Sequence, residues 1–222
     1  MSTRRLVAVL ARPPVASRTG GGVDAPAAPA AGLAPPGVDD AALALAMVED
    51  VVDLVSGMRE VEAALVLAPG FEAARDTVWP GMPVCEMSAG FTLVDALDAL
   101  AELGADEGTV VAGDAPDLPP LLLGKLHSAL TAAQVAVCPA DGGGLVALAA
   151  RLPVPAWLRE AANQVDPDNE KILPALGRVA PRSALNVGSG WHRIRRPEDV
   201  VRLDPGLEGW EATRALLSSP AS

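Results

Sequence analysis

Tyrosine is absent from this 222-residue sequence, and Phe and Trp bring the aromatic content to only 3%. Half of the residues are nevertheless hydrophobic, so the core must be built from Ala, Val and Leu. The length fits one domain over residues 1–222, which is large enough to bury such a core.

Cysteines and long apolar runs are also scarce. Cys85 and Cys138 are the two cysteines, and their spacing fits no metal-binding motif, so we expect a reducing, cytoplasmic setting. The run from Leu6 to Ala11 is shorter than the roughly 7–15 residues of a signal-peptide core, and it predicts a first buried strand instead. No segment reaches the roughly 18 apolar residues of a membrane span.

Positive charge is in deficit, because the formal net charge is −11. Non-specific nucleic-acid binding depends on basic patches that neutralise phosphates, so we expect no nucleic-acid partner. A single nucleotide is not excluded, since it needs only a few local donors.

The rest of the sequence alternates between apolar strand-like segments and helix-like segments. Strands are predicted over residues 6–11, 62–69, 82–87, 108–113 and 134–139, and helices over 38–57, 91–104 and 116–130. The first of these helices is expected to start near Asp39 or Asp40 and to end just before Gly57. Because the strands are apolar throughout and separated by helices, the predicted fold class is α/β. We expect a doubly wound, mainly parallel, Rossmann-like sheet with helices on both faces.

A loop near the N-terminus and a helical region at the C-terminus complete the predicted fold. Residues 20–37 are rich in Gly, Ala and Pro and predict a mobile loop. Residues 155–179 predict one or two helices, and 196–203 predict a short helix. A terminal helix over 206–219 is expected to pack Trp210 and Leu216 on the sheet.

Two successive predicted strands end in loops that carry aspartate. Asp114 and Asp117 lie in GDAPD, and Asp141 lies in CPADGGG before Gly142 and Gly143. Ligands of open α/β sheets bind at the carboxyl ends of strands. Aspartates there offer hard oxygen ligands to magnesium or manganese, and glycines let a substrate approach the backbone.

Each aspartate also has a purely structural interpretation, which the sequence leaves open. Asp117 precedes LPPLLLGKL and is suited to cap that helix, with Pro119 in its first turn. Asp114 and Asp141 are suited to stabilise turns.

The two histidines and the strand-end cysteine are interpreted as structural. His127 is expected to be a surface or partly buried helix residue rather than a base. His192 is expected to be structural or phosphate-binding, and Cys138 to lie in the core.

The segment from about residue 109 to 155, which includes VVAGDAPDLPPLLLGKL and VCPADGGG, resembles a bacterial glycosyltransferase-A-fold family of the nucleotide-diphospho-sugar transferase superfamily. It is similar, more distantly, to 2-phospho-L-lactate guanylyltransferase and molybdenum-cofactor nucleotidyltransferases. Weaker matches cover LVAVLARPPVASRT and WHRIRRPEDVVRL. The resemblance implies transfer of a glycosyl or nucleotidyl group from a nucleotide or nucleotide-sugar to a small acceptor, with Mg or Mn at the diphosphate. The alternative is a non-catalytic ligand-binding or scaffolding protein of the same fold.

The resemblance also implies roles for individual residues. It implies catalytic roles for Asp114 and Asp141, metal binding by Asp114 and Asp117, and nucleotide binding by Ala11, Arg12, Arg18, Thr19, Gly113, Gly142 and Gly143.

Arg193 and Arg195 stand where the family has late acidic ligands. If residues 191–195 form a strand, both arginines share one face. We expect them to contact either ligand phosphates or acidic side chains near Asp114, because arginine binds both in a bidentate manner. The alternative is that they are solvated surface charges.

Overall fold

The computed structural model describes residues 3–14, 32–161 and 165–218. The predicted loop at 20–37 lies mostly outside the described residues, as do Arg18 and Thr19. The end of that loop is described from Gly32, and Leu33 there is buried.

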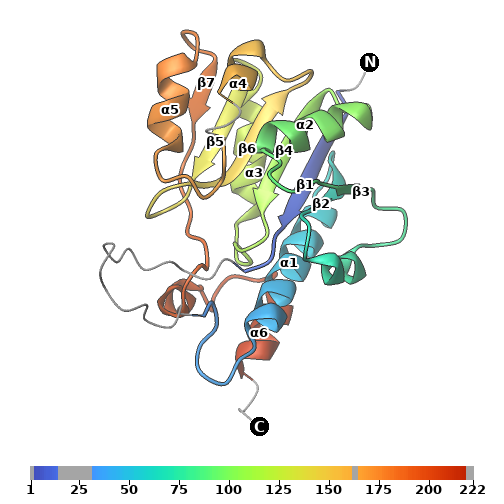
Figure 1. The fold of residues 1–222 in the computed structure, drawn as a ribbon, viewed down its shortest axis with the longest axis vertical. Helices are drawn as coiled ribbons and strands as arrows, with labels where there is room; N and C mark the ends of the chain where they lie inside the picture. The colour runs from blue at the N-terminus through green and yellow to red at the C-terminus, as the bar shows by residue number, and fades with distance from the viewer. Residues whose placement is uncertain (1–2, 15–31, 162–164, 219–222) are drawn as a thin grey trace.

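Seven strands form one sheet in the order β3-β2-β1-β4-β6-β5-β7 (Figure 1). The strands are β1 (Arg5–Ala11), β2 (Glu62–Leu67), β3 (Val84–Glu86), β4 (Glu107–Ala112), β5 (Val135–Pro139), β6 (Leu145–Arg151) and β7 (Leu185–Val187). Only β6 runs antiparallel to its neighbours β4 and β5; the other pairings are parallel. The predicted α/β class and mainly parallel sheet are therefore confirmed.

The helices cover both faces of this sheet. They are α1 (Asp40–Ser56), α2 (Leu93–Glu102), α3 (Pro120–Ala129), α4 (Ala156–Glu160), α5 (Ile172–Val179) and α6 (Glu211–Ser218), with 3₁₀ helices η1 (Glu72–Thr77) and η3 (Pro197–Arg202). Alternate residues of β1 enter two separate cores: Val7 and Val9 pack with α1 and α3, whereas Leu6 and Ala8 pack with α2, α4 and α5. Such two-sided burial explains why the strand sequences are apolar throughout.

Helix α1 shows how the sequence fixes one of these layers. The Asp39 side chain caps the helix by accepting from the amide of Ala42 at 2.8 Å, and Gly57 follows the last helical residue. Leu43, Met47 and other buried residues recur every three or four positions and face the core. Both predicted ends of this helix are confirmed.

Strand β6 is the main element that the sequence analysis missed. It follows Gly142, Gly143 and Gly144 and inserts between β4 and β5, so these two successive predicted strands are not adjacent in the sheet. The short edge strand β7 was missed as well.

The C-terminal region confirms one expectation and corrects another. Residues 155–179 form two helices as predicted, but α6 packs on α1 rather than on the sheet, and the two helices lie side by side in Figure 1. The buried carboxylate of Asp50 on α1 accepts from the amides of Ala212 and Thr213 at 2.9 and 2.8 Å, which fixes the first turn of α6. Trp210, just before α6, is buried in the same core as α1.

Candidate functional site

A pocket of about 320 Å³ opens at the carboxyl ends of β1 and β4. The chain leaves β1 toward β2 and β3 on one side, and returns to β4 on the other side of β1. This is the topological switch point of the sheet, where open α/β folds place their ligands. The pocket therefore lies where the strand order alone predicts a binding site.

Gly113 forms the floor of the pocket at the end of β4. A Cβ atom at this position would lie 2.7 Å from Val48 Cγ2 and 2.9 Å from the carbonyl oxygen of Leu10. Only glycine therefore lets β1, β4 and α1 converge here, and the turn that follows carries Asp114 to the pocket wall.

The Arg193 side chain occupies a cage of oxygen atoms beside this floor. Its Nε and Nη2 donate to the two carboxylate oxygens of Asp114 at 2.5 and 2.7 Å. Its Nη1 lies 2.7 Å from Asp168 Oδ1 and donates to the carbonyls of Pro167 at 3.0 Å and Leu145 at 3.2 Å. Arg193 is only 7% exposed, so it is a buried cation held by two carboxylates and two carbonyls.

The charges of this cage determine its protonation. Burial alone would lower the pKa of Arg193, but the negative charges of Asp114 and Asp168 outweigh burial and raise it. The guanidinium therefore stays positively charged at every physiological pH. Burial, followed by repulsion from Arg193, lowers the pKa of the neighbouring Arg195.

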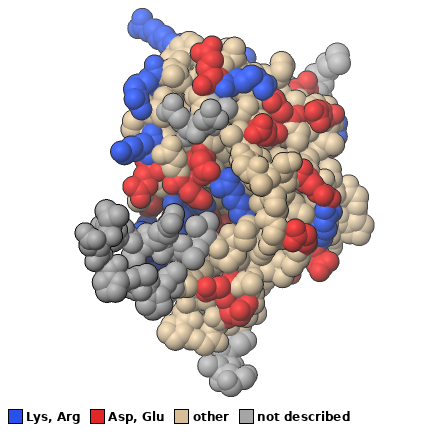
Figure 2. Space-filling model, viewed as in Figure 1, with Lys and Arg blue, Asp and Glu red and all other residues tan. Residues whose placement is uncertain are grey.

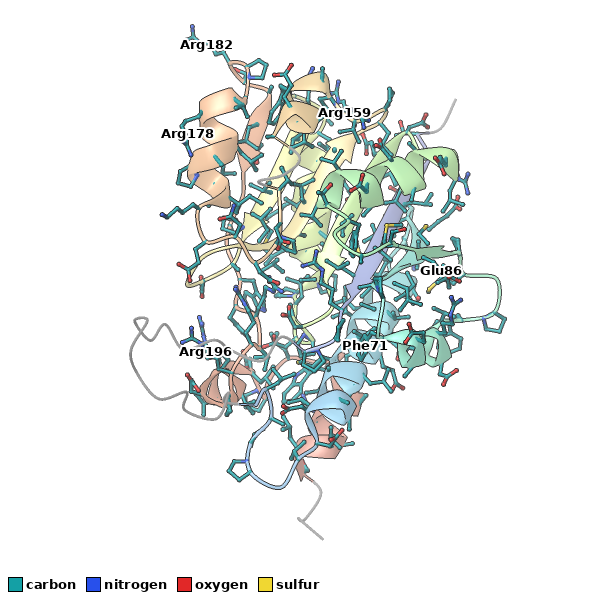
Figure 3. All side chains as sticks on the ribbon, in the orientation of Figure 1. Phe71, Glu86, Arg159, Arg178, Arg182 and Arg196 are labelled. Atoms are coloured by element: carbon teal, nitrogen blue, oxygen red, sulfur yellow. The ribbon has the colours of Figure 1, made fainter. Side chains whose placement is uncertain are left out.

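Three further arginines line the pocket. Arg195 Nη2 donates to the carbonyl of Gly143 at 2.8 Å. The Arg12 guanidinium lies 5.1 Å from the centroid of the Phe91 ring, and its Nη1 is 3.4 Å from Asp166 and 3.5 Å from Asp168. Arg196 also lines the pocket, but its side chain is 62% exposed and projects from the ribbon in Figure 3.

The opposite wall of the pocket is apolar. Met47 and Val48 come from α1, and Leu33 comes from the segment before it. This wall suits an uncharged part of a ligand, while the arginines suit an anionic part.

The pocket contrasts with the surface of the protein. Four arginines and three carboxylates line it, although the whole chain has a net charge of −11. On the face shown in Figure 2, basic and acidic side chains are interspersed over the described part of the chain. The described lining of the pocket therefore carries a small excess of positive charge in an otherwise acidic chain.

The structure brings together only some of the predicted site residues. Arg12, Gly113, Asp114, Arg193 and Arg195 all line the pocket. Of the two contacts expected for Arg193, the one with acidic side chains is observed, although residues 191–195 pair with the sheet only through a bridge between Trp191 and Ala140 in the described chain. Ala11 is fully buried in β1.

The second predicted loop is not part of the described pocket lining, although the carbonyl of Gly143 accepts from the lining residue Arg195. Asp141 is half-exposed and pairs with Arg202 of η3. Neither it nor Gly142 or Gly143 is among the described residues that line the pocket. The physical reason is β6, which separates β5 and its loop from β4.

Asp117 serves neither as a helix cap nor as part of the pocket lining. Helix α3 begins at Pro120, and its N-cap position is Pro119. The buried carboxylate of Asp117 instead accepts from Trp191 Nε1 at 3.2 Å and from the amide of Asp204 at 3.1 Å, and it lies 3.0 Å from His192 Nε2. The capping interpretation is therefore wrong, whereas the structural interpretation of His192 agrees with this contact.

The other residues considered in the sequence are structural. Burial, and then the charge of Arg5, lowers the pKa of His127, whose Nε2 lies 2.9 Å from Thr109 Oγ1; His127 is more buried than expected. Cys138 is in the core as predicted, and burial raises its pKa to about 11. It and Cys85 are free thiols.

Sequence reasoning missed Asp168 and Glu170, as well as the apolar wall. The segment VDPDNE fell within residues 155–179, which were predicted as one or two helices, and residues 165–169 form a loop that reaches the pocket. The cluster of three acids within that segment was the available signal. Gly144 permits the approach of this loop, because a Cβ there would lie 2.3 Å from the carbonyl oxygen of Pro167.

These residues do not fit the divalent cation that the resemblance implies. Both oxygens of Asp114 accept from Arg193, and Asp168 lies against the same guanidinium. Within residues 3–14, 32–161 and 165–218, no three His, Cys, Asp or Glu side chains are grouped to hold a metal ion. A divalent cation next to Arg193 would also be repelled by it.

Known proteins were compared at the levels of sequence and structure. The sequence matches no protein family and no curated protein. The structure is similar to a candidate nucleotide-diphospho-sugar transferase from Desulfovibrio desulfuricans, with a TM-score of 0.67, 15% identity, and 97% of each chain covered.

Two further solved structures share the fold. One is 4-diphosphocytidyl-2C-methyl-D-erythritol synthase from Anaerococcus prevotii, with a TM-score of 0.60, 14% identity, and 91% of this chain and 95% of that one covered. The other is CMP:2-keto-3-deoxy-manno-octonic acid synthetase complexed with CTP, with a TM-score of 0.56, 13% identity, and coverage of 90% and 96%. This chain thus has the fold of the nucleotide-diphospho-sugar transferase superfamily, as its sequence predicted.

The helices of the described chain were also considered as membrane spans. Among residues 3–14, 32–161 and 165–218, no helix combines the length and apolar character needed to cross a bilayer.

Proposed function

We propose that this protein is a transferase that binds a nucleotide or nucleotide-sugar in the pocket between β1 and β4. The observation that carries the proposal is the concentration of four arginines at the topological switch point of a strongly acidic chain. Phosphate groups are the anions that arginines bind best, because the planar guanidinium donates two parallel hydrogen bonds. The shared fold supports a nucleotide as the source of those phosphates.

Different residues of the pocket are suited to bind different parts of the ligand. Arg195, Arg12 and Arg196 lie where they can bind phosphate oxygens, and the wall of Leu33, Met47 and Val48 can take an uncharged portion of the ligand. Asp114 and Asp168 hold Arg193 in place. Arg18 and Thr19, outside the described residues, remain candidates for phosphate contacts, as the resemblance implies.

The reaction that we propose is transfer of a glycosyl or nucleotidyl group to a small acceptor. Arginines that bind the diphosphate would stabilise the negative charge that develops on the leaving phosphate oxygen. The proposed setting is the cytoplasm, where Cys85 and Cys138 would remain reduced thiols.

Thermal unfolding in the presence of nucleotides tests this proposal. A panel of nucleoside triphosphates, diphosphates and nucleotide-sugars is measured with and without Mg²⁺ or Mn²⁺. A ligand at about one hundred times its Kd stabilises the native state by about 2.7 kcal/mol, so a member of the panel that binds will raise Tm by several degrees. No increase with any member would contradict the proposal.

Variants locate the binding. Arg195→Ala is expected to weaken binding by about tenfold or more, because it removes a charge-assisted phosphate contact. Arg182→Ala is the matched control: it removes the same charge at the end of the molecule opposite Arg196 (Figure 3). Equal affinities of the two variants would exclude this pocket.

A second measurement separates transfer from binding alone. Ligands that bind are incubated with sugar phosphates, and ³¹P NMR follows release of pyrophosphate or nucleoside diphosphate. Binding without turnover over the whole acceptor panel would support the non-catalytic alternative.

A further inference from the structure

The Arg193 cage has the composition of a cation site. Five oxygen atoms surround the guanidinium: two from Asp114, one from Asp168, and the carbonyl oxygens of Leu145 and Pro167. Carboxylate and carbonyl oxygens are also the ligands that hard divalent cations take in proteins. In this cage the cation is the guanidinium of Arg193, which belongs to the chain, and not a bound metal ion.

The contacts around the cage hold the Arg193 guanidinium in place. Arg193 is buried, and the amide of Ile194, the next residue, donates to the carbonyl of Asp114 at 2.8 Å. Both the side chain and the backbone of this segment are therefore attached to the same turn after β4. These contacts hold the guanidinium in the cage.

We propose that Arg193 takes the place of a divalent cation, so that the pocket binds a diphosphate-containing ligand without a metal ion. The inference rests on the proposed function in that the ligand is a nucleotide or nucleotide-sugar. It adds that the positive charge beside its phosphates comes from Arg193, with Arg195 and Arg12 as the flanking donors. Arginine suits this task because it remains charged and donates in a fixed planar geometry.

The charge balance over the whole pocket lining, rather than over the cage alone, supports this assignment. Asp114 and Asp168 together carry two negative charges, and Arg193 cancels one of them. Carboxylates repel phosphate, and Mg²⁺ sites commonly bring the two together by placing the cation between one or two carboxylates and the substrate phosphates. Among the described residues, the four lining arginines, Arg193, Arg195, Arg12 and Arg196, outnumber the three lining carboxylates by one.

Manganese binding tests the cage directly. Wild-type protein titrated with Mn²⁺ alone and followed by electron paramagnetic resonance should leave the free Mn²⁺ signal undiminished. Arg193→Gln, which keeps much of the side-chain volume but removes the charge, should gain one Mn²⁺ site, because Asp114 and Asp168 become available. Adding Asp114→Asn to that variant should abolish the new site.

A matched control uses the other strand-end ion pair. Arg202→Ala releases Asp141, which has no second carboxylate in a shared cage, and it should gain no Mn²⁺ site. If Arg193→Gln fails to fold, the wild-type titration still decides the question. A wild-type Mn²⁺ site that Asp114→Asn removes would overturn the proposal.

Calorimetry with inorganic pyrophosphate provides a second decision. Pyrophosphate should bind wild-type protein in metal-free buffer containing EDTA, with an affinity within about threefold of that in excess Mg²⁺. If pyrophosphate binding required Mg²⁺, the proposal that Arg193 replaces a divalent cation would be wrong.

The two proposals can fail separately. If nucleotides bind only with Mn²⁺ or Mg²⁺, the built-in cation is wrong and the proposed function stands. If no nucleotide binds, but wild-type protein excludes Mn²⁺ and Arg193→Gln gains it, the proposed function is wrong and the cation assignment stands.

Discussion

Asp114 and Asp117 lie three residues apart in one turn after β4, yet they occupy opposite environments. The Asp114 side chain is 23% exposed, faces the pocket and pairs with Arg193. The Asp117 side chain is fully buried and is held by Trp191, His192 and the amide of Asp204. One crossing segment, residues 191–193, thus supplies the Arg193 cation to Asp114 and the rings of Trp191 and His192 to Asp117. The comparison shows that residue type alone does not distinguish a ligand-facing carboxylate from a structural one.

Asp141 extends the comparison to the end of β5. It too pairs with an arginine, Arg202, but its side chain is 53% exposed and that of Arg202 is 39% exposed. Water therefore screens this pair, whereas Arg193 is only 7% exposed. The three aspartates therefore form a series of increasing exposure. Asp117 belongs to a buried network, Asp114 to a partly buried ion pair in the pocket, and Asp141 to a solvated ion pair on the surface.

The largest expected effect is that of removing the Arg193 cation. Arg193→Ala should lower the free energy of unfolding by about 3–5 kcal/mol, because it leaves Asp114 and Asp168 close together without their cation. Urea denaturation followed by tryptophan fluorescence measures the loss.

A double variant shows whether the loss comes from unpaired charge. Arg193→Ala combined with Asp114→Asn should be more stable than the sum of the two single losses predicts, because the removed carboxylate charge no longer needs a partner. Strict additivity would mean that the two side chains stabilise the fold independently, contrary to the ion pair.

The sequence predicts the strands and helices that carry these aspartates better than it predicts the contacts between them. Apolar runs located five strands, and Asp39 and Gly57 marked the ends of α1, because strand burial and helix capping depend on local sequence. Strand β6 was missed because its Leu- and Ala-rich sequence has no strong strand preference and it pairs through tertiary contacts.

In the site, too, local sequence identified individual residues but not the distant residues that contact them. Asp114 was found from its position after a strand, but Arg193 meets it across 79 positions and Asp168 joins from a third segment. No spacing rule connects these three segments. The charge reversal at Arg193 was visible in the sequence, whereas the cage that it fills required the structure.

The next effect in size concerns the buried aspartate. Asp117→Asn should cost about 2 kcal/mol at pH 7, because an amide nitrogen replaces an oxygen that accepts from buried donors. Burial alone would raise the pKa of Asp117, but His192, the amide of Asp204 and Trp191 outweigh it and lower the pKa. Denaturation of both proteins at pH 7 and pH 3 measures the difference.

The direction of the pH effect follows from that lowered pKa. A carboxyl group with a lower pKa in the folded state stabilises the protein above its unfolded pKa, near 3.9, and loses that contribution as pH falls through the folded value. The difference in stability between wild type and Asp117→Asn should therefore shrink as the pH falls below about 4. A difference that stays constant down to the lowest measurable pH would show that the charge of Asp117 contributes nothing.

The smallest expected effect is that of Arg202→Ala. Because the Asp141–Arg202 pair is substantially exposed, it should contribute only about 0–1 kcal/mol to stability. Any loss should decrease further in 1 M salt, where charges are screened beyond about 3 Å. Urea denaturation at low and high salt measures both quantities. A loss comparable to that of Arg193→Ala would remove the distinction between the two strand ends, since burial would then not determine which aspartate–arginine pair stabilises the fold.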